Sequence, residues 1–225
     1  MCIRDRLGCG RSDKSSITYT NFVYVQMISD FIKKIIGQKT DVIASGFSGS
    51  FVTMACHNEK ELFNKIMLVN PPSLTQLKQM PNRKDRLLKA ALEIPIFGTL
   101  VYHMIVSRDN INNLFIEKMY YNPFHVDNQM ADAYYEAAHK GGYYTRFLYS
   151  SLAAKYININ ICHALKALDN SIYIVEGETE PNGKAVTDDY CASNPAIEVS
   201  VLKETKHLPH VEAPEAFLEQ VKIFF

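Results

Sequence analysis

The sequence lacks an excess of charge of either sign. Its 225 residues include 24 Lys and Arg and 24 Asp and Glu, so the formal net charge is zero. Proteins that bind nucleic acid or an anionic membrane through long-range electrostatics carry a basic surplus or a basic run. The balance argues against a nucleic-acid partner.

Cysteine is scarce and has no pairing pattern. The cysteines are an odd number at wide spacing, with no C-x-x-C pair among them: Cys2, Cys9, Cys56, Cys162 and Cys191. Disulfide frameworks and structural zinc sites both need closely and regularly spaced cysteines. We therefore expect reduced thiols, no metal site and a cytoplasmic protein.

Long apolar runs are also absent. No segment approaches the roughly 20 apolar residues of a membrane span, and the N-terminus has no apolar signal-peptide core. The chain opens with MCIRDR, which looks like translated sequencing-adapter sequence, and no first strand precedes LGCGRSDK. We expect no membrane span, and we expect the natural chain to begin further upstream.

The hydrophobic pattern that is present predicts an α/β fold. Apolar residues at helical spacing over 22–36 precede a short strand at 41–45, a helix over 51–56 and a buried strand at 65–73. A strand, a helix and a strand with short links imply a parallel sheet. The same alternation of strands and helices returns near the C-terminus, with strands predicted at 171–177 and 196–204 and a helix at 213–225.

The middle of the chain has a different texture. Residues 78–168 contain no clear strand, are rich in Tyr, Met and Phe, and are broken by Pro95, Gly98, Pro123 and the Gly141-Gly142 pair. We predict a helical cap over 78–168, inserted into a core made of 1–77 and 169–225.

Ser48 stands where the strand at 41–45 gives way to a helix, in the string GFSGS. A nucleophile on such a turn is pushed out of the top of the sheet, and its strained backbone tolerates only small neighbours. The amides at the start of the following helix stabilise negative charge that develops there. We predict Ser48 as a nucleophile and the Gly49 amide as an oxyanion donor.

Four motifs together resemble the α/β-hydrolase fold family over nearly the whole chain. GFSGS is similar to its nucleophile elbow, with Ser in place of the usual last Gly, and LGCGRSDK is similar to the loop after its fourth strand. KHLPHVEAPEAF resembles the H-x-P-x-x-E-x-P-E-x-F ending. GETEP resembles the G-x-x-D-P loop, with Glu where Asp is commoner. The resemblance implies strands five to eight of that fold, with a helical cap.

The same resemblance implies a triad of Ser48, Glu180 and His207, in the family's order of nucleophile, acid and base. His207 would take the serine proton, and a carboxylate would fix the imidazole. Other carboxylates near Glu180 stay open as the acid: Glu178, Asp188 and Asp189. The family's other oxyanion donor and the strands beside the strand at 41–45 precede this chain. We therefore expect the 225 residues alone to be inactive and, because that strand would have an open apolar edge, poorly soluble.

These features predict a capped serine hydrolase, without a cofactor, that cleaves a small carboxylic ester or related acyl substrate through an acyl-enzyme. Cleavage of a carbon–carbon bond by the same triad is one alternative. A non-catalytic small-ligand receptor, or an inactive fragment, is another. The sequence leaves the substrate and the oligomeric state open, and the remaining histidines are expected to be structural: His57, His103, His125, His139, His163 and His210.

Overall fold

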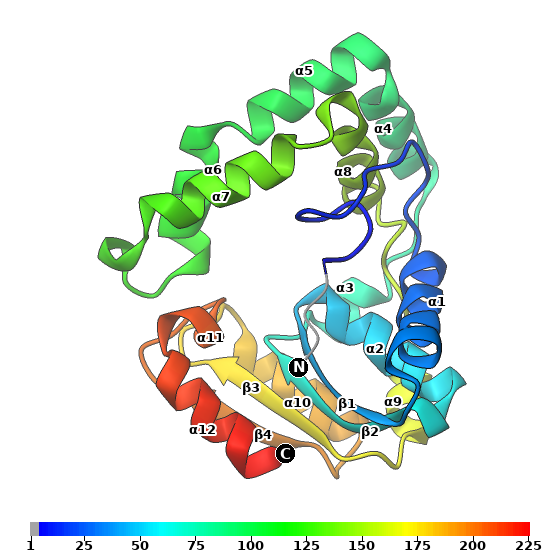
Figure 1. Cartoon of the computed structure of the whole chain (residues 1–225), viewed down its shortest axis with the longest axis vertical. Helices are drawn as coiled ribbons and strands as arrows, with labels where there is room; N and C mark the ends of the chain where they lie inside the picture. The colour runs from blue at the N-terminus through cyan, green and yellow to red at the C-terminus, as the bar shows by residue number, and fades with distance from the viewer. Residues whose placement is uncertain (1–4) are drawn as a thin grey trace.

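The computed structural model describes residues 5–225. Cys2 and the first four residues of the MCIRDR segment lie outside the described residues, so the expectations drawn from them stay predictions. Figure 1 shows the described chain as a sheet with flanking helices, from which a long helical arm rises and curves back.

Four strands form one sheet, in the order β1-β2-β3-β4, and every neighbouring pair is parallel. The strands are β1 (Thr40–Ser45), β2 (Phe63–Val69), β3 (Ile172–Gly177) and β4 (Glu198–Leu202). Ser45 pairs with Val69, and Val69 with Val175, so the carboxyl ends of the first three strands meet at one edge. The predicted parallel α/β fold is confirmed. Among the described residues, β2 is the only strand partner of β1.

The second strand ends earlier than predicted. The sequence pattern placed its end near Ser73, but β2 stops at Val69. Asn70 has φ +42°, in the left-handed region, and turns the chain away from the ladder. Pro71 and Pro72 follow and have no N–H to donate to a neighbouring strand.

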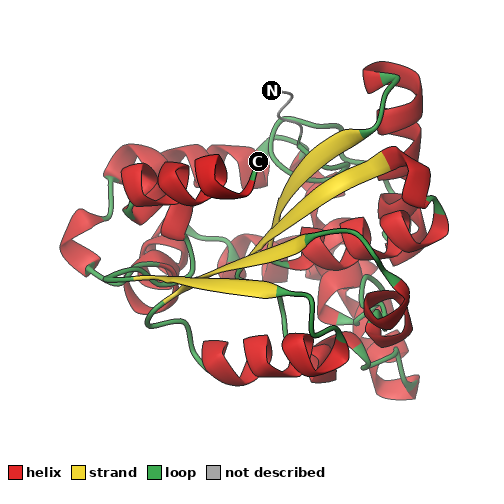
Figure 2. Ribbon diagram, turned by 90° about the horizontal axis from the view of Figure 1, so that it is seen from below, coloured by secondary structure: helices red, strands yellow, loops and turns green. Residues whose placement is uncertain are grey.

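Alternate side chains of the strands enter two different cores. Ile66 and Leu68 pack with α1 (Asn21–Phe31) and α2 (Phe47–Asn58), whereas Met67 packs against α12 (Pro214–Phe224). Figure 2 accordingly shows helices on both sides of the sheet. The other helical elements of this core are η1 (Ile32–Ile36), η2 (Lys60–Leu62), α3 (Leu74–Leu77), α9 (Cys162–Ala167), α10 (Gly183–Ser193) and α11 (Pro209–Glu212).

Between α3 and α9 the described chain forms only helices and turns, as predicted for the middle of the sequence. We call residues 83–153 the helical arm. It consists of α4 (Arg83–Glu93), α5 (Pro95–Ile105), α6 (Arg108–Leu114), η3 (Phe115–Met119), η4 (Pro123–His125), α7 (Asn128–His139), η5 (Gly142–Tyr144) and α8 (Thr145–Ala153). Pro95 begins α5 rather than only interrupting a helix. The division into two domains at 77/78 and 168/169 stays a prediction.

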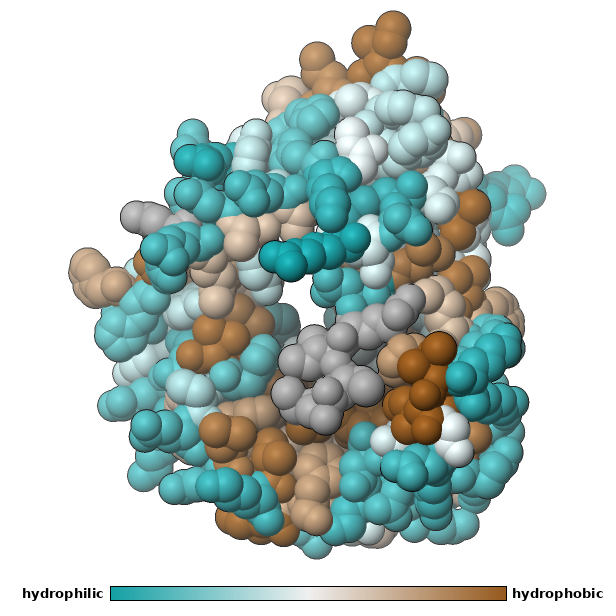
Figure 3. Space-filling model, viewed as in Figure 1, coloured by the Kyte–Doolittle hydropathy of each residue, from teal (hydrophilic) through white to brown (hydrophobic). Residues whose placement is uncertain are grey.

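The outer tip of the helical arm is apolar. Ile96 at the start of α5 is 85% exposed, and Ile94 and Phe97 beside it are exposed as well. Figure 3 shows apolar side chains gathered at this tip. Among the described residues no single helix has both the length and the apolarity needed to cross a bilayer, and α4 and α5 reach that length only as a pair bent by 96°.

Gly177 ends β3 where the backbone of Lys206 crosses it. A Cβ built on Gly177 would lie 2.0 Å from the Lys206 carbonyl oxygen, so one of the two backbones would have to move. We predict that Gly177→Ala lowers the free energy of unfolding by about 1–3 kcal/mol, the usual cost of overpacking. Urea unfolding followed by circular dichroism measures this loss.

Gly49→Ala is the matched control for Gly177→Ala. Its new Cβ would meet the flexible side chain of Leu68 at 3.1 Å and no backbone closer than 4.0 Å. An equal loss of stability in the two variants would contradict the role given to Gly177.

Candidate active site

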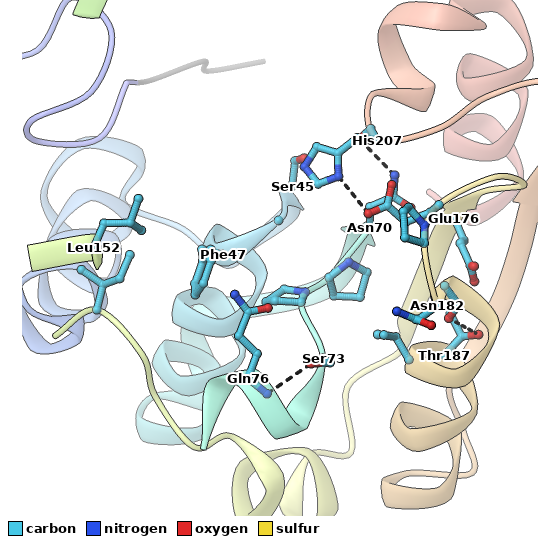
Figure 4. Close-up of a pocket in the computed structure, with 18 of the residues that line it drawn as sticks. Ser45, Phe47, Asn70, Ser73, Gln76, Leu152, Glu176, Asn182, Thr187 and His207 are labelled. Atoms are coloured by element: carbon cyan, nitrogen blue, oxygen red, sulfur yellow. Dashed lines mark hydrogen bonds and ion pairs between the residues drawn. The ribbon is translucent and has the colours of Figure 1, made fainter. Parts of the chain in front are cut away.

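A cavity of about 600 Å³ opens at the carboxyl ends of β1, β2 and β3. This volume lies within the range of small-molecule sites in proteins. Figure 4 shows side chains from the strand ends and from the loop after β4 converging on the cavity. Its lining includes Tyr24, Ser45, Gly46, Phe47, Asn70, Ser73, Leu148, Leu152, Glu176, Glu180, Thr187 and His207.

The turn from β1 into α2 is strained at Gly46. Gly46 has φ +56° and ψ −132°, a backbone region that is essentially open to glycine alone. Its amide donates to the Val69 carbonyl oxygen (2.9 Å), which fixes the turn at the edge of the sheet. The sequence placed the strained residue at Ser48, but the structure places it two residues earlier, and Ser48 does not line the cavity.

The reason for this difference is that either of two residues in this segment could be the centre of the elbow. GFSGS has small residues on both sides of Ser48, but ASGFS, residues 44–48, has small residues on both sides of Gly46. The end of the strand decides which residue is the centre. Ser45 still pairs with Val69 in the sheet, so the turn falls at Gly46 and Ser48 lies in the first turn of α2.

The predicted oxyanion donor, the amide of Gly49, is already engaged. It donates to the Gly46 carbonyl oxygen at 3.0 Å. Gly49 is buried, and its place against Leu68 explains its small size. Phe47 is the first residue of α2 and lines the cavity, and its amide has no acceptor among the described residues. Because the Phe47 amide is free and lies at a helix N-terminus, it is better placed than the Gly49 amide to stabilise negative charge.

His207 and Glu180 are brought together by two loops. Glu180 follows β3, and His207 lies between β4 and α11. His207 Nδ1 lies 3.0 Å from Glu180 Oε1, and because a carboxylate oxygen only accepts, Nδ1 is the donor. The second carboxylate oxygen, Oε2, is buried and has no partner among the described residues. This arrangement holds the imidazole in the tautomer whose Nε2 is free to accept a proton.

The alternative acids do not contact His207. Glu178 Oε2 accepts a hydrogen bond from the Glu204 amide at 3.0 Å, on the exposed side of the loop. Asp188 and Asp189 lie within α10 and have no ion pair with the imidazole. Among the four carboxylates considered, Glu180 alone has the geometry of an acid partner.

Asn70 joins the loops that carry these two residues. Its Oδ1 accepts from the Gly177 amide (3.0 Å), and its Nδ2 donates to the carbonyl oxygens of Lys206 (2.8 Å) and His207 (3.0 Å). Asn70 is buried, so these bonds are shielded from water. Sequence reasoning missed this clamp, because the partners of Asn70 lie more than 100 residues away in sequence.

The helical arm bonds directly to the His207 loop. The His207 amide donates to the Met119 carbonyl oxygen of η3 at 3.1 Å. Glu212, the glutamate of the H-x-P-x-x-E motif, accepts from the amides of Lys206 (2.7 Å) and Tyr121 (2.6 Å) through its two oxygens. The loop that presents the imidazole is therefore held from the core side by Asn70 and from the arm side by Glu212.

Two further titratable groups lie near the site. Glu176, at the end of β3, is buried, and burial raises the pKa of its carboxyl, with the charge of Glu180 acting in the same direction. Burial also lowers the pKa of His210, with a smaller effect from His207, so the neutral form of His210 is favoured. Within residues 5–225 no group of three or more His, Cys, Asp or Glu side chains could hold a metal ion.

The other predicted structural histidines lie outside the cavity lining. Their rings contact one another or neighbouring polar groups: His57 with His163, His103 with His139, and His125 with Asn122.

The sequence matches the model of the alpha/beta hydrolase family over residues 5–220. No curated protein matches it. Among solved structures, it is similar to a serine hydrolase involved in carbazole degradation, with a TM-score of 0.75, 15% identity, 97% of this chain covered and 76% of that one. It is also similar to a carboxylesterase of the ammonia-oxidizing thaumarchaeon Nitrososphaera gargenis (0.68, 15%, 96% and 76%) and to 2-hydroxy-6-oxo-6-phenylhexa-2,4-dienoate hydrolase of Rhodococcus sp. strain RHA1 (0.73, 16%, 97% and 77%). At these identities the likeness shows the fold.

We predict that Asn70→Asp is strongly destabilising although the two side chains have the same shape. The substitution keeps the acceptor for Gly177 but turns a carboxylate oxygen toward the carbonyl oxygens of Lys206 and His207. We expect a loss of about 2–4 kcal/mol in the free energy of unfolding at neutral pH, measured in urea. A loss below about 0.5 kcal/mol, within the range of ordinary surface substitutions, would contradict the clamp.

A second prediction concerns pH and Glu176. Its folded-state pKa lies above its unfolded value, so the folded protein binds this proton more tightly. The carboxyl therefore contributes most to stability at low pH, and the contribution is lost as the pH rises from about 4.3 through the raised value. We expect Glu176→Gln, which stays neutral, to gain stability relative to the wild type over this rise. Urea midpoints measured from about pH 4 to 7 that change in parallel for the two proteins would refute it.

Proposed function

Because the chain belongs to the alpha/beta hydrolase family, we propose that it is a serine hydrolase that cleaves a carboxylic ester or a related acyl compound through an acyl-enzyme. The observation that carries this proposal is the 3.0 Å contact between His207 and Glu180 at the wall of the cavity. A hydroxyl is a weak nucleophile at neutral pH, and an imidazole fixed by a carboxylate is the group that activates it.

The pair can support both halves of an acyl transfer. Neutral His207 accepts a proton at Nε2, and the Glu180 carboxylate, which is hydrogen-bonded to Nδ1, stabilises the positive charge that develops on the ring. The imidazolium then returns the proton to the leaving alcohol. The Phe47 amide, at the N-terminus of α2, can donate to the carbonyl oxygen as it gains negative charge.

The cavity wall formed by the helical arm suits an apolar acyl group. Leu148 and Leu152 of α8 line the cavity, and Figure 4 shows Leu152 across the cavity from His207. An ester whose carbonyl lies beside His207 would place its carbon chain toward these side chains. We therefore propose that the substrate is a small molecule with an apolar acyl group.

One observation favours a second candidate, a small-molecule binding protein without turnover. Gly46, at the strained turn, has no side chain that could act as a nucleophile. If no other hydroxyl in the cavity replaces it, the pocket would bind an acyl compound and leave it intact. Hydrolysis of a panel of p-nitrophenyl esters of increasing acyl length separates the two candidates, because only the first releases p-nitrophenol.

We predict that Glu180→Gln lowers kcat on the ester of that panel that is hydrolysed fastest by about 10²–10⁴-fold, with little effect on the thermal midpoint. The amide can no longer hold the imidazole in the required tautomer or face its positive charge. Steady-state kinetics and thermal unfolding of the same preparations provide the measurement.

Glu178→Gln is the matched control, because Glu178 lies two residues away and its carboxylate accepts from the Glu204 amide instead. We expect its kcat to stay within about twofold of the wild type, a change of less than about 0.5 kcal/mol in the barrier. Comparable losses in both variants would show that the acid lies elsewhere.

A further inference from the structure

We infer that Ser45, and not Ser48, supplies the nucleophilic hydroxyl. This inference rests on the proposed function, which requires a serine but does not require the one that the sequence motif singles out. Three observations carry it: the position of the strained turn, the free hydroxyl of Ser45 and its direction relative to His207.

The first observation concerns the space at the turn. The strained residue of an elbow presents its side chain to the cavity, and here that residue is Gly46. A Cβ built on Gly46 would meet no atom within 4 Å, so the apex of the turn is open. Ser48 lies beyond the apex in α2 and is not part of the cavity lining. A serine on the strand side of the open apex is better placed than one on the helix side.

The second observation concerns which hydroxyls are free. Of the other hydroxyl side chains in the lining, that of Tyr24 donates to Leu7, that of Ser73 caps α3, and that of Thr187 donates to Gly183. Ser45 is exposed at the end of β1, and its hydroxyl has no hydrogen bond within the described residues. It is the one cavity hydroxyl of the described chain that is not already engaged.

The third observation concerns direction. Figure 4 shows the Ser45 side chain pointing toward the imidazole of His207. Because Nδ1 of that ring faces Glu180, the ring edge left for a nucleophile is the one that carries Nε2. Ser45 and Glu180 thus approach His207 from different elements, the first from β1 and the second from the turn after β3.

The reaction balances without any other reagent than water. Ser45 Oγ bonds to the carbonyl carbon as its proton passes to His207 Nε2, and the Phe47 amide donates to the oxyanion. The carbon–oxygen bond of the ester then breaks, and the His207 proton goes to the leaving alcohol. Water attacks the acyl-enzyme, gives its proton to His207, and the bond from Ser45 to the acyl carbon breaks as that proton returns to Oγ.

The test is covalent labelling with a fluorescent fluorophosphonate, together with turnover of p-nitrophenyl acetate. We expect the wild type and Ser48→Ala to be labelled, and Ser45→Ala to lose the label and at least about 10²-fold in kcat. Cleavage at Lys39 and Lys60 releases residues 40–60, so fragmentation of that peptide in a mass spectrometer assigns the adduct to one serine.

A second variant shows that loss of the label is not loss of the fold. Gly46→Ser in the Ser45→Ala background puts a hydroxyl into the open apex, beside the same His207. We expect it to regain labelling at position 46, at a cost of about 1–3 kcal/mol in stability for a side chain on this strained backbone. Thermal midpoints of all variants are measured in parallel.

Each remaining outcome overturns the inference. If Ser48→Ala loses the label and Ser45→Ala keeps it, the motif serine is the nucleophile. If the wild type turns over the ester but is never labelled, Ser45 is not the nucleophile, and of the proposed function only ester hydrolysis survives, without the acyl-enzyme. If the wild type neither binds the label nor turns over any ester of the panel, the proposed function itself fails.

Discussion

Three hydrogen bonds from one buried amide hold the candidate site together. Parallel strands align their carboxyl ends, but the loops that follow them share no backbone ladder and need another link. Asn70 provides it, because its side chain both accepts from β3 and donates to the His207 loop. An asparagine suits this position for two reasons: it offers a donor and an acceptor on one planar group, and it tolerates the left-handed backbone better than most residues.

The same loop also belongs, in part, to the helical arm. Met119 accepts from the His207 amide, and Glu212 accepts from one amide of the loop and one of the arm. An apolar cluster that includes Phe115 of the arm also packs against Leu208 of the loop. The arm therefore does more than line the cavity, because the position of the imidazole depends on contacts between its loop and the arm.

Much of this could be predicted from the sequence, where the signal was local. The short apolar runs over β2 and β3 predicted the parallel sheet, and the H-x-P-x-x-E and G-x-x-x-P strings pointed to His207 and Glu180, which the fold brings into contact. The turn at Gly46 could not be settled in the same way, since small residues flank two candidate centres and only the pairing of Ser45 with Val69 selects one. The role of Asn70 was invisible because it depends on partners far along the chain.

The separation in sequence between Asn70 and its partners bears on how the site folds. Asn70 and Gly177 are 107 residues apart in sequence, and the helical arm occupies most of the interval. Closing a flexible loop of that length costs about 4 kcal/mol of chain entropy by the (3/2)RT ln n relation. The β1-α2-β2 unit closes over a far shorter interval, so its turn can form while the middle of the chain is still unfolded. The arm separates the two halves of the site in sequence, so we expect the Gly46 turn to form early and the base and its carboxylate to join it later, once the arm has folded.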